Sequence, residues 1–249
     1  MYSRGAKSAG LNLANLPPTI DPVVRPEEVH HLENGAKTVF DRGVTLDVAI
    51  YRTTLFDYQT SVLDPSGAGG RLVNYISNVD EARSEGIEVD ARWAIGDRFS
   101  LSANVAFADG VYVHHPNGPC PIEVSLTPMR CDLSGRPLGG APKRASALAL
   151  DAVQPLSRGR ALHGRLGYNR QSDVLTGLGA SRYSRVEGFG LVNLNIGVRM
   201  IERGWDVALW ARNLMDEDYY QMLAGRTSGL INGVTGEPRT VGVTFSGVF

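Results

Sequence analysis

The chain has 249 residues, a formal net charge of −1 and 43% hydrophobic residues. The near-neutral charge argues against nucleic-acid binding, and no stretch approaches the roughly 18 unbroken apolar residues that a membrane-spanning helix needs. The mean hydropathy of −0.13 is that of an ordinary soluble protein. A transmembrane β-barrel has the same average, because its lipid-facing and lumen-facing residues alternate.

The chain begins with Met1-Tyr-Ser-Arg-Gly-Ala-Lys7, which has neither the apolar core nor the cleavage site of a secretion signal. A membrane β-barrel needs a secretion signal to reach its membrane. We therefore expect either that the chain is a piece of a longer precursor or that it is not such a barrel. Counted back from the C-terminus there are nine strands, and these first residues are assigned as a tenth.

Most of the chain alternates apolar and polar residues at every second position, which is typical of half-buried β-strands. In 98–108, for example, the apolar Phe99 and Leu101 flank the polar Ser100. The segment 144–153 alternates poorly and is assigned as a strand by its position. The segments with clear alternation are 44–52, 85–95, 98–108, 162–169, 190–200 and 205–212.

The last segment, Arg239–Phe249, also alternates, with Val241, Val243 and Phe245 on the face that ends at Phe249. An apolar face that runs to the chain end and stops on an aromatic residue is typical of the strand that closes an outer-membrane barrel. In a soluble protein, such an exposed terminal strand would leave an unpaired edge.

The connections between the expected strands take two sizes in turn. Short polar turns fall at 41–43, 96–97, 157–159 and 202–204, and long Gly/Pro/Asn-rich segments fall at 61–71, 110–142, 174–185 and 215–237. Short turns at one edge and long loops at the other are typical of outer-membrane barrels, whereas a soluble sandwich has no reason to sort its loops. The sequence therefore predicts an all-β fold, an antiparallel transmembrane β-barrel with about ten strands in this chain.

Charged residues on the polar face of these strands are candidates for ligand contact in a hydrated interior. His163 and Arg165 share that face, where they line a path for an anionic ligand or form an internal salt-bridge network, and the network is the favoured interpretation. The remaining candidates on this face are Arg92, Arg199 and Arg212.

The longest loop, 110–142, contains two features with chemical potential. His114 and His115 suggest a haem or metal site, although two solvated loop histidines are the favoured interpretation. Cys120 and Cys131 are close enough in sequence to form a disulfide in an oxidising compartment. They make a poor zinc site, because there is no CxxC motif and no paired histidine spacing. No metal, no cofactor and no enzymatic activity are expected, since the chain has no GxSxG, HExxH, P-loop or dinucleotide motif.

Six segments, in this order along nearly all of the chain, give it a family resemblance. They are Tyr2–Asn12, Arg25–Lys37, Asn78–Glu88, Gly135–Pro142, Trp210–Tyr219 and Gly236–Val243. Together they resemble the C-terminal part of TonB-dependent outer-membrane receptors. The chain departs from the family pattern at Asp80, where glycine is usual, and at Ala6 and Ala9, yet none of these interrupts a strand.

The resemblance implies that residues 1–249 form the C-terminal portion of a 22-stranded, plugged barrel, without the signal peptide, TonB box and plug domain. Residues 71–95 then form one long strand. It further implies residence in the outer membrane of a Gram-negative bacterium, in contact with its lipid. A small-molecule ligand such as a ferric siderophore is captured by the external loops, with 110–142 as the first candidate. Energy comes from the TonB complex through the missing N-terminal part.

Three alternatives remain open at this point. The ten strands form a small passive porin-like barrel, or the chain is a non-functional truncated receptor fragment, or the strands form a soluble β-sandwich. Half an open barrel in lipid leaves two unpaired edges, so the isolated chain is expected to aggregate or to need a partner half.

Asn213 and Asp216 are assigned to the turn before the last strand.

Overall fold

A computed structural model describes residues 1–13, 16, 20–41, 43–67, 71–124, 130–176, 180–225 and 230–247, with the backbone alone for 63–67 and 71–72. Phe249, on which the prediction of a closing strand depends, lies outside these residues. The strand that precedes it, β18 (Thr240–Gly247), is described and lies at one edge of the main sheet. No helix in the described ranges is long and apolar enough to cross a lipid bilayer.

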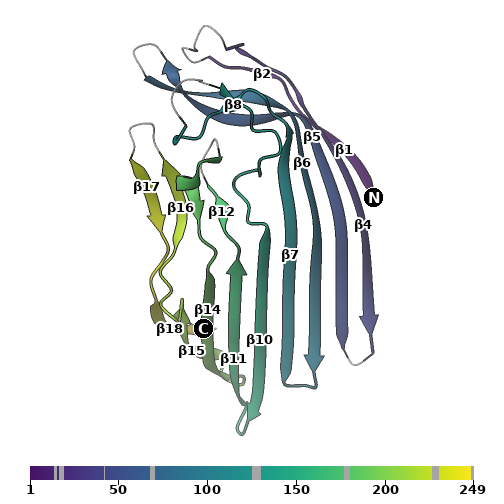
Figure 1. Cartoon of the computed structure of the whole chain (residues 1–249). Helices are drawn as coiled ribbons and strands as arrows, with labels where there is room; N and C mark the ends of the chain where they lie inside the picture. The colour runs from purple at the N-terminus through teal and green to yellow at the C-terminus, as the bar shows by residue number, and fades with distance from the viewer. Residues whose placement is uncertain are drawn as a thin grey trace.

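One antiparallel sheet contains ten of the strands in the described part of the chain, and we call it the wall (Figure 1). Its order follows the chain, from β1 at one edge to β18 at the other, so each strand pairs with its neighbours in sequence. In order, the wall strands are β1 (Tyr2–Lys7), β4 (Glu27–Phe40), β5 (Val44–Gly67), β6 (Arg71–Ile95), β7 (Phe99–His114), β10 (Arg144–Leu156), β11 (Arg160–Gln171), β14 (Gly190–Met200), β15 (Trp205–Arg212) and β18. The predicted tenth strand at the N-terminus, the single strand over 71–95 and the strand that begins at 144 are therefore confirmed.

The register keeps like residues on one face across the wall. Val48 lies opposite Val89, which lies opposite Val105 on the next strand. One position away, Asp47 lies opposite Asp90 on the other face. Because successive side chains of a strand point to opposite faces, the wall has one apolar face and one polar face. We call them the outer and the inner face, and the predicted alternation is confirmed over the described strands.

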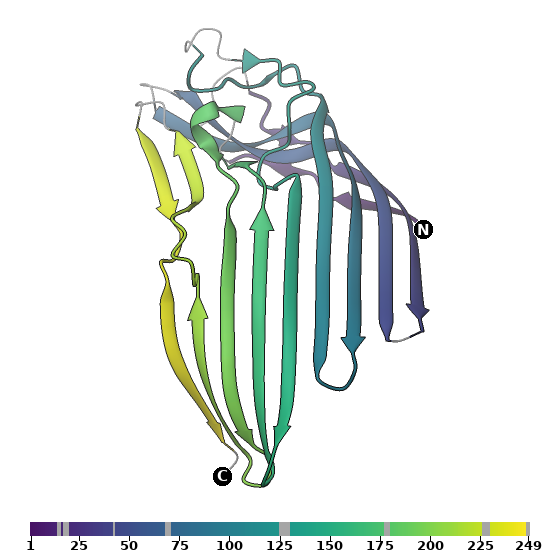
Figure 2. The same cartoon turned by 60° about the horizontal axis from the view of Figure 1, so that its bottom comes forward.

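The short turns and the long loops lie at opposite ends of the wall, as predicted (Figure 2). Each of the four short hairpin turns has a glycine with a positive φ, a conformation that other residues adopt only with strain. These glycines are Gly43, Gly96, Gly159 and Gly204, with φ between 62° and 73°. The tight turns therefore fix the register at one end, while the other end carries long loops.

The prediction of a long loop at 61–71 is wrong. β5 continues to Gly67 and β6 begins at Arg71, so these two strands extend well beyond the rest of the wall and bend over its long-loop end (Figure 1). The strands continue because their side chains are buried there: Val62 is 1% exposed and Tyr75 is 4% exposed. Val62 lies opposite Tyr75, so both are on one face of the hairpin, and Ile76 on the other face is 38% exposed.

Each of the other long segments folds into a small two-stranded sheet of its own. These sheets are β2 (Gly10–Leu11) with β3 (Val23–Val24), β8 (Gly118–Pro119) with β9 (Arg130–Cys131), β12 (Val174–Leu175) with β13 (Arg185–Val186), and β16 (Tyr220–Gly225) with β17 (Ile231–Thr235); a short 3₁₀ helix, η2 (Arg182–Ser184), lies between β12 and β13. We call the described residues of 8–26, 57–81, 110–143, 172–189 and 213–239 the loop layer. The largest fully buried side chains, Val62, Val79, Val186 and Ser184, all belong to it.

Candidate functional site

Two of the hollows on the inner face of the described wall are neighbours that share Asn104 and Ala147. The larger has a volume of about 760 Å³ and is lined by β4 to β10, with Lys37, Asp47 and Asp90 among its polar side chains. The smaller has a volume of about 400 Å³ and is lined by β7 to β18, with Trp210 and Arg212. Hollows of this size, with a few polar groups, are typical of small-molecule sites. The inner face is therefore the candidate site, together with the loop layer above it.

Aromatic rings lie flat on this face where the opposite residue is glycine. A Cβ added to Gly86 would lie 2.6 Å from the Tyr51 hydroxyl oxygen, and one added to Gly242 would lie 2.3 Å from the Trp210 ring. Glycine is needed at both positions so that the ring can cover the neighbouring strand. Gly86 therefore relieves crowding within the long strand β6.

Trp210 and Arg212 both line the smaller hollow and contact each other there. The Arg212 guanidinium carbon lies 5.3 Å from the centre of the Trp210 ring, within the range of a cation–π interaction. The indole nitrogen Nε1 of Trp210 donates a hydrogen bond of 3.1 Å to Thr244 Oγ1, which fixes the ring. Within the described residues, no carboxylate pairs with Arg212. Its positive charge therefore faces the hollow.

His163, Arg165 and Arg199 are instead engaged in ion pairs. His163 Nε2 lies 2.8 Å and Arg199 Nε lies 3.1 Å from the same oxygen of Asp206. Arg165 Nη1 donates to both carboxylate oxygens of Asp151 at 3.0 Å. For His163 and Arg165 the structure has the salt bridges that the sequence favoured, and Arg199 shares the partner of His163.

Arg92 lies at a different place from the other predicted arginines. It is on β6, near the short turns, with Nε 3.7 Å from Asp90 Oδ1 and a side chain that is 74% exposed. Four acidic residues of the inner face lie on this side, since Glu33, Asp47 and Glu88 line the same hollow as Asp90. The β4–β7 side of the inner face is therefore acidic, whereas Arg212 marks a basic area on the β10–β18 side.

The two histidines of the longest loop have opposite environments. The His114 side chain is 63% exposed, with Nε2 3.6 Å from Asp80 Oδ2. His115 is only 4% exposed, its ring centre lies 5.0 Å from that of Tyr112, and burial lowers the pKa of its imidazole. The interpretation of two solvated histidines is wrong for His115, because its side chain is buried within the loop layer. Neither histidine lines the two inner hollows.

Cys120 and Cys131 form the predicted disulfide, with an S–S distance of 2.01 Å and Cα atoms 4.9 Å apart. The bond joins Cys120, the residue after β8, to Cys131 at the end of β9. Among the described residues, no group of three or more His, Cys, Asp or Glu side chains is arranged to hold a metal ion.

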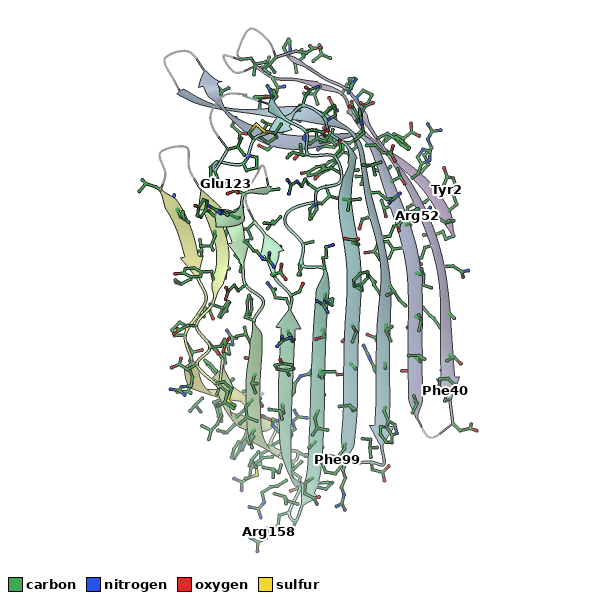
Figure 3. The ribbon with its side chains drawn as sticks, in the orientation of Figure 1. Tyr2, Phe40, Arg52, Phe99, Glu123 and Arg158 are labelled. Carbon is green, nitrogen blue, oxygen red and sulfur yellow. A yellow bond between two sulfur atoms is a disulfide. The ribbon has the colours of Figure 1, made fainter. Side chains whose placement is uncertain are left out.

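Glu123, inside the disulfide-closed loop, is a functional candidate that sequence reasoning missed. Its carboxylate accepts hydrogen bonds from Ser181 Oγ at 2.7 Å and from the Arg182 backbone nitrogen at 2.9 Å (Figure 3). Burial alone would raise its pKa, but the hydrogen bonds from Arg182 and Ser181 outweigh it and lower the pKa of the carboxyl. We call this contact the loop clasp. It joins two loops that are 58 positions apart, so no local pattern indicates it.

Asn213 and Asp216 organise the turn before the last strand, as predicted. Asn213 is 4% exposed, with a φ of 47°, and its side-chain amide donates to the carbonyls of Glu217 and Glu237 at 2.9 and 3.1 Å. Asp216 accepts a hydrogen bond of 2.9 Å from the backbone nitrogen of Arg239. These bonds hold the start and the end of the loop that contains β16 and β17 together.

Comparison with known proteins places this architecture in a family. Residues 1–214 match the family model described as TonB dependent receptor-like, beta-barrel. Comparison of the sequence with curated proteins gave no significant match. The match covers the wall from β1 to β15 and most of the loop layer.

Solved structures of similar fold support the same assignment. The ferric yersiniabactin uptake receptor FyuA from Yersinia pestis superposes with a TM-score of 0.75, at 19% identity, over 98% of this chain and 33% of its own. The siderophore receptor PiuA from Acinetobacter baumannii superposes with a TM-score of 0.69, at 19% identity. The alignment covers 98% of this chain and 32% of PiuA. The copper transporter OprC superposes with a TM-score of 0.69, at 16% identity, over 93% of this chain and 33% of OprC. The chain therefore spans about a third of the length of these structures, and at such identities the likeness concerns the fold alone.

Proposed function

Because the chain belongs to the family of TonB-dependent receptor β-barrels, we propose that it forms part of an outer-membrane receptor for a scarce, bulky nutrient, with an iron–siderophore complex as the ligand. The observation that carries the proposal is the family match over residues 1–214, together with a wall that is apolar outside and polar inside. A structure of this kind moves its ligand without making or breaking a covalent bond.

The proposed location in the outer membrane agrees with the character of the two faces. Ile196 and Leu209 on the outer face are 46% and 63% exposed to solvent, which is costly in water and favourable in lipid. In lipid, the unpaired backbone groups of β1 and β18 must find partners. We therefore propose that further strands pair with both edges in the functional protein.

The proposed ligand path follows the basic side of the inner face. Arg212 and Trp210 offer a positive charge and an aromatic surface to the smaller hollow, a combination that suits an anionic, partly aromatic iron chelate. Arg165, Arg199 and His163 lie on the same side, with the carboxylates of Asp151 and Asp206 as their partners. His114 and Arg92 are further candidates for contact, from the loop layer and from the end with the short turns. Buried His115 contributes to loop structure instead.

The proposed source of energy is the TonB complex of the inner membrane, reached through a part of the receptor beyond the wall described here. Loop movement above the hollows, with the loop clasp as one contact that has to open, admits the ligand. A passive porin-like barrel remains the competing proposal, since it needs no energy source.

The experiment that tests this function is uptake of radioactive iron by cells that produce the receptor from its natural gene, in a host without receptors of its own. Each member of a panel of catecholate, hydroxamate and mixed ferric siderophores is supplied in turn, to cells with and without TonB. We expect uptake of at least one siderophore that disappears without TonB. Uptake that is equal in both hosts supports a passive barrel, and no uptake from the whole panel contradicts an iron–siderophore ligand.

A further inference from the structure

On five neighbouring strands, a charged residue on the outer face follows the apolar run in the direction of the loop layer. On β5, for example, Ile50 is followed on the same face by Arg52, which lies opposite Glu85. We call these residues the charged rim. They are Arg52 on β5, Glu85 on β6, Asp109 on β7, Arg144 on β10 and Arg170 on β11. The rim marks the boundary at which the outer face changes from apolar to polar.

Part of the charged rim is neutralised within the chain. Arg52 Nε lies 2.6 Å from Glu85 Oε1, and Lys143 Nζ lies 2.5 Å from Asp109 Oδ1. Arg144 and Arg170 differ, because neither guanidinium has a carboxylate within 4.0 Å among the residues that the structure describes. The only side-chain contact of Arg170 there is a long hydrogen bond of 3.5 Å to the Tyr168 hydroxyl.

The two unpaired arginines are close neighbours on the outer face. Ser146 lies opposite Arg170, and Arg144 is two positions from Ser146 on the same face of β10. Residues in this diagonal relation have Cα atoms roughly 7–8 Å apart, well within the reach of arginine side chains. Two exposed positive charges at this distance repel each other unless an anion lies between them. Phosphate is the anion that fits best, because it accepts paired hydrogen bonds from more than one guanidinium.

The surface next to these arginines is apolar, which decides between a free ion and a lipid. Leu148 and Leu166 lie toward the short turns from the arginines on the same face, and they are 42% and 45% exposed. Tyr168 lies between this apolar area and Arg170, with a polar hydroxyl at the boundary. A molecule with phosphate at one end and acyl chains at the other matches both parts of the surface.

We propose that Arg144 and Arg170 bind the phosphate of a phosphorylated lipid in the leaflet at the long-loop end, with its acyl chains along Leu148 and Leu166. The site rests on the proposed membrane location, because only in lipid does the outer face meet acyl chains. It is separate from the inner hollows, and it anchors the wall at a fixed depth in the membrane.

The test is a titration of the natural, detergent-solubilised receptor with lipid A that carries two phosphates, followed by native mass spectrometry. The variant Arg144→Gln/Arg170→Gln is compared with Arg158→Gln/Arg203→Gln. The second variant removes the same charge from exposed arginines in two short turns, and Figure 3 shows Arg158 at the end opposite the loop layer. We expect at least tenfold weaker binding for the first variant and a change of less than twofold for the second.

Three outcomes overturn the proposal. The first is equal lipid affinity for the wild type and both variants. The second is equal binding of the same lipid after its phosphates are removed. The third is competition by inorganic phosphate at the concentration of the lipid, because that result would identify a site for the free ion. Recovery of the wild-type receptor in the outer-membrane fraction is measured in parallel. If it is absent from that fraction, the proposed function fails; if it is present and lipid binding is unchanged in the variant, only the lipid site fails.

Discussion

The wall and the loop layer are built on different physical principles. In the wall, large apolar side chains face outward and remain exposed, as Leu209 at 63% and Val243 at 64% show. In the loop layer, Val79 is completely buried and Leu133 is 3% exposed. The loop layer thus contains a core like that of a soluble protein, whereas the wall depends on backbone hydrogen bonds between strands and on whatever apolar medium covers its outer face.

This difference explains where the candidate functional groups lie. The wall fixes its inner side chains by register, so Asp206, His163 and Arg199 meet at defined distances. The loop layer brings together residues from segments far apart in sequence, as in the loop clasp of Glu123 with Ser181. A rigid wall with a separately packed loop layer allows the loops to move without change in the wall.

The largest expected effect comes from the core of the loop layer. Leu133→Ala should destabilise this layer by about 2–5 kcal/mol, because it leaves a cavity in a packed core. Hydrogen exchange of residues 110–124 should become faster while β14 exchanges as before. The control is Leu13→Ala, since Leu13 is 92% exposed. Equal effects of the two substitutions would mean that the loop layer has no packed core.

A charge on the outer face of the wall should have the next largest effect. Ile196→Arg should reduce the free energy of unfolding in lipid vesicles by about 2–4 kcal/mol, because the charge must enter the bilayer near its middle. Asn195→Arg, one position away on the inner face, should have a much smaller effect. If the inner substitution proved the more damaging, the assignment of the two faces would be reversed.

The disulfide should stabilise the longest loop by about 3 kcal/mol, the value for a closed loop of this length. Cys120→Ser/Cys131→Ser should therefore make residues 118–124 sensitive to proteases. Because these are the only two cysteines in the chain, reductant should give the wild type the same sensitivity and leave the variant unchanged. A resistant reduced protein would contradict this role.

Loss of the loop clasp should have a smaller effect. Glu123→Gln keeps the shape of the side chain and removes the charge, so the contact with Ser181 and Arg182 should weaken by about 1 kcal/mol. Distances between spin labels on the two loops should broaden. Glu187→Gln, an exposed carboxylate in the same region, is the control and should leave these distances unchanged.

The smallest effect should be a dependence of the loop layer on pH. The lowered pKa of His115 means that the unfolded loop binds the proton more readily than the folded one. Stability should therefore fall as pH drops below about 6.5, the ordinary histidine value. The lowered pKa of Glu123 adds a second loss at lower pH, as its carboxylate is protonated. His115→Gln should remove the first step in hydrogen exchange and retain the second.

Sequence patterns predicted the wall well, because its alternation is a direct consequence of two different environments. They were weakest on β10, where Ala145, Ala147 and Ala149 occupy inner positions that are polar on other strands. The first two of these alanines line the larger hollow, so small side chains are needed there. At these positions a small side chain leaves space for the hollow, whereas a polar side chain would only favour contact with water. A periodic pattern of apolar and polar residues does not indicate that need for space.

The loop layer was predicted less well, for a different physical reason. The disulfide was found because only two cysteines are present and close in sequence. The burial of His115 and the contacts of Glu123 depend on segments distant in the chain, and nothing in the surrounding residues indicates them. The extension of β5 and β6 was mistaken for a loop because Pro65 and Gly67, residue types common in turns, lie within it.

The most direct test of this account is the accessibility of spin labels at successive positions of β14, from Asn193 to Val198, in the natural receptor reconstituted in lipid. Labels at Leu194, Ile196 and Val198 should collide with oxygen dissolved in the bilayer. Labels at Asn193 and Asn195 should collide with a water-soluble nickel reagent, which gives an alternation of period two. Uniform access of the nickel reagent to all positions would contradict a wall with one face in lipid.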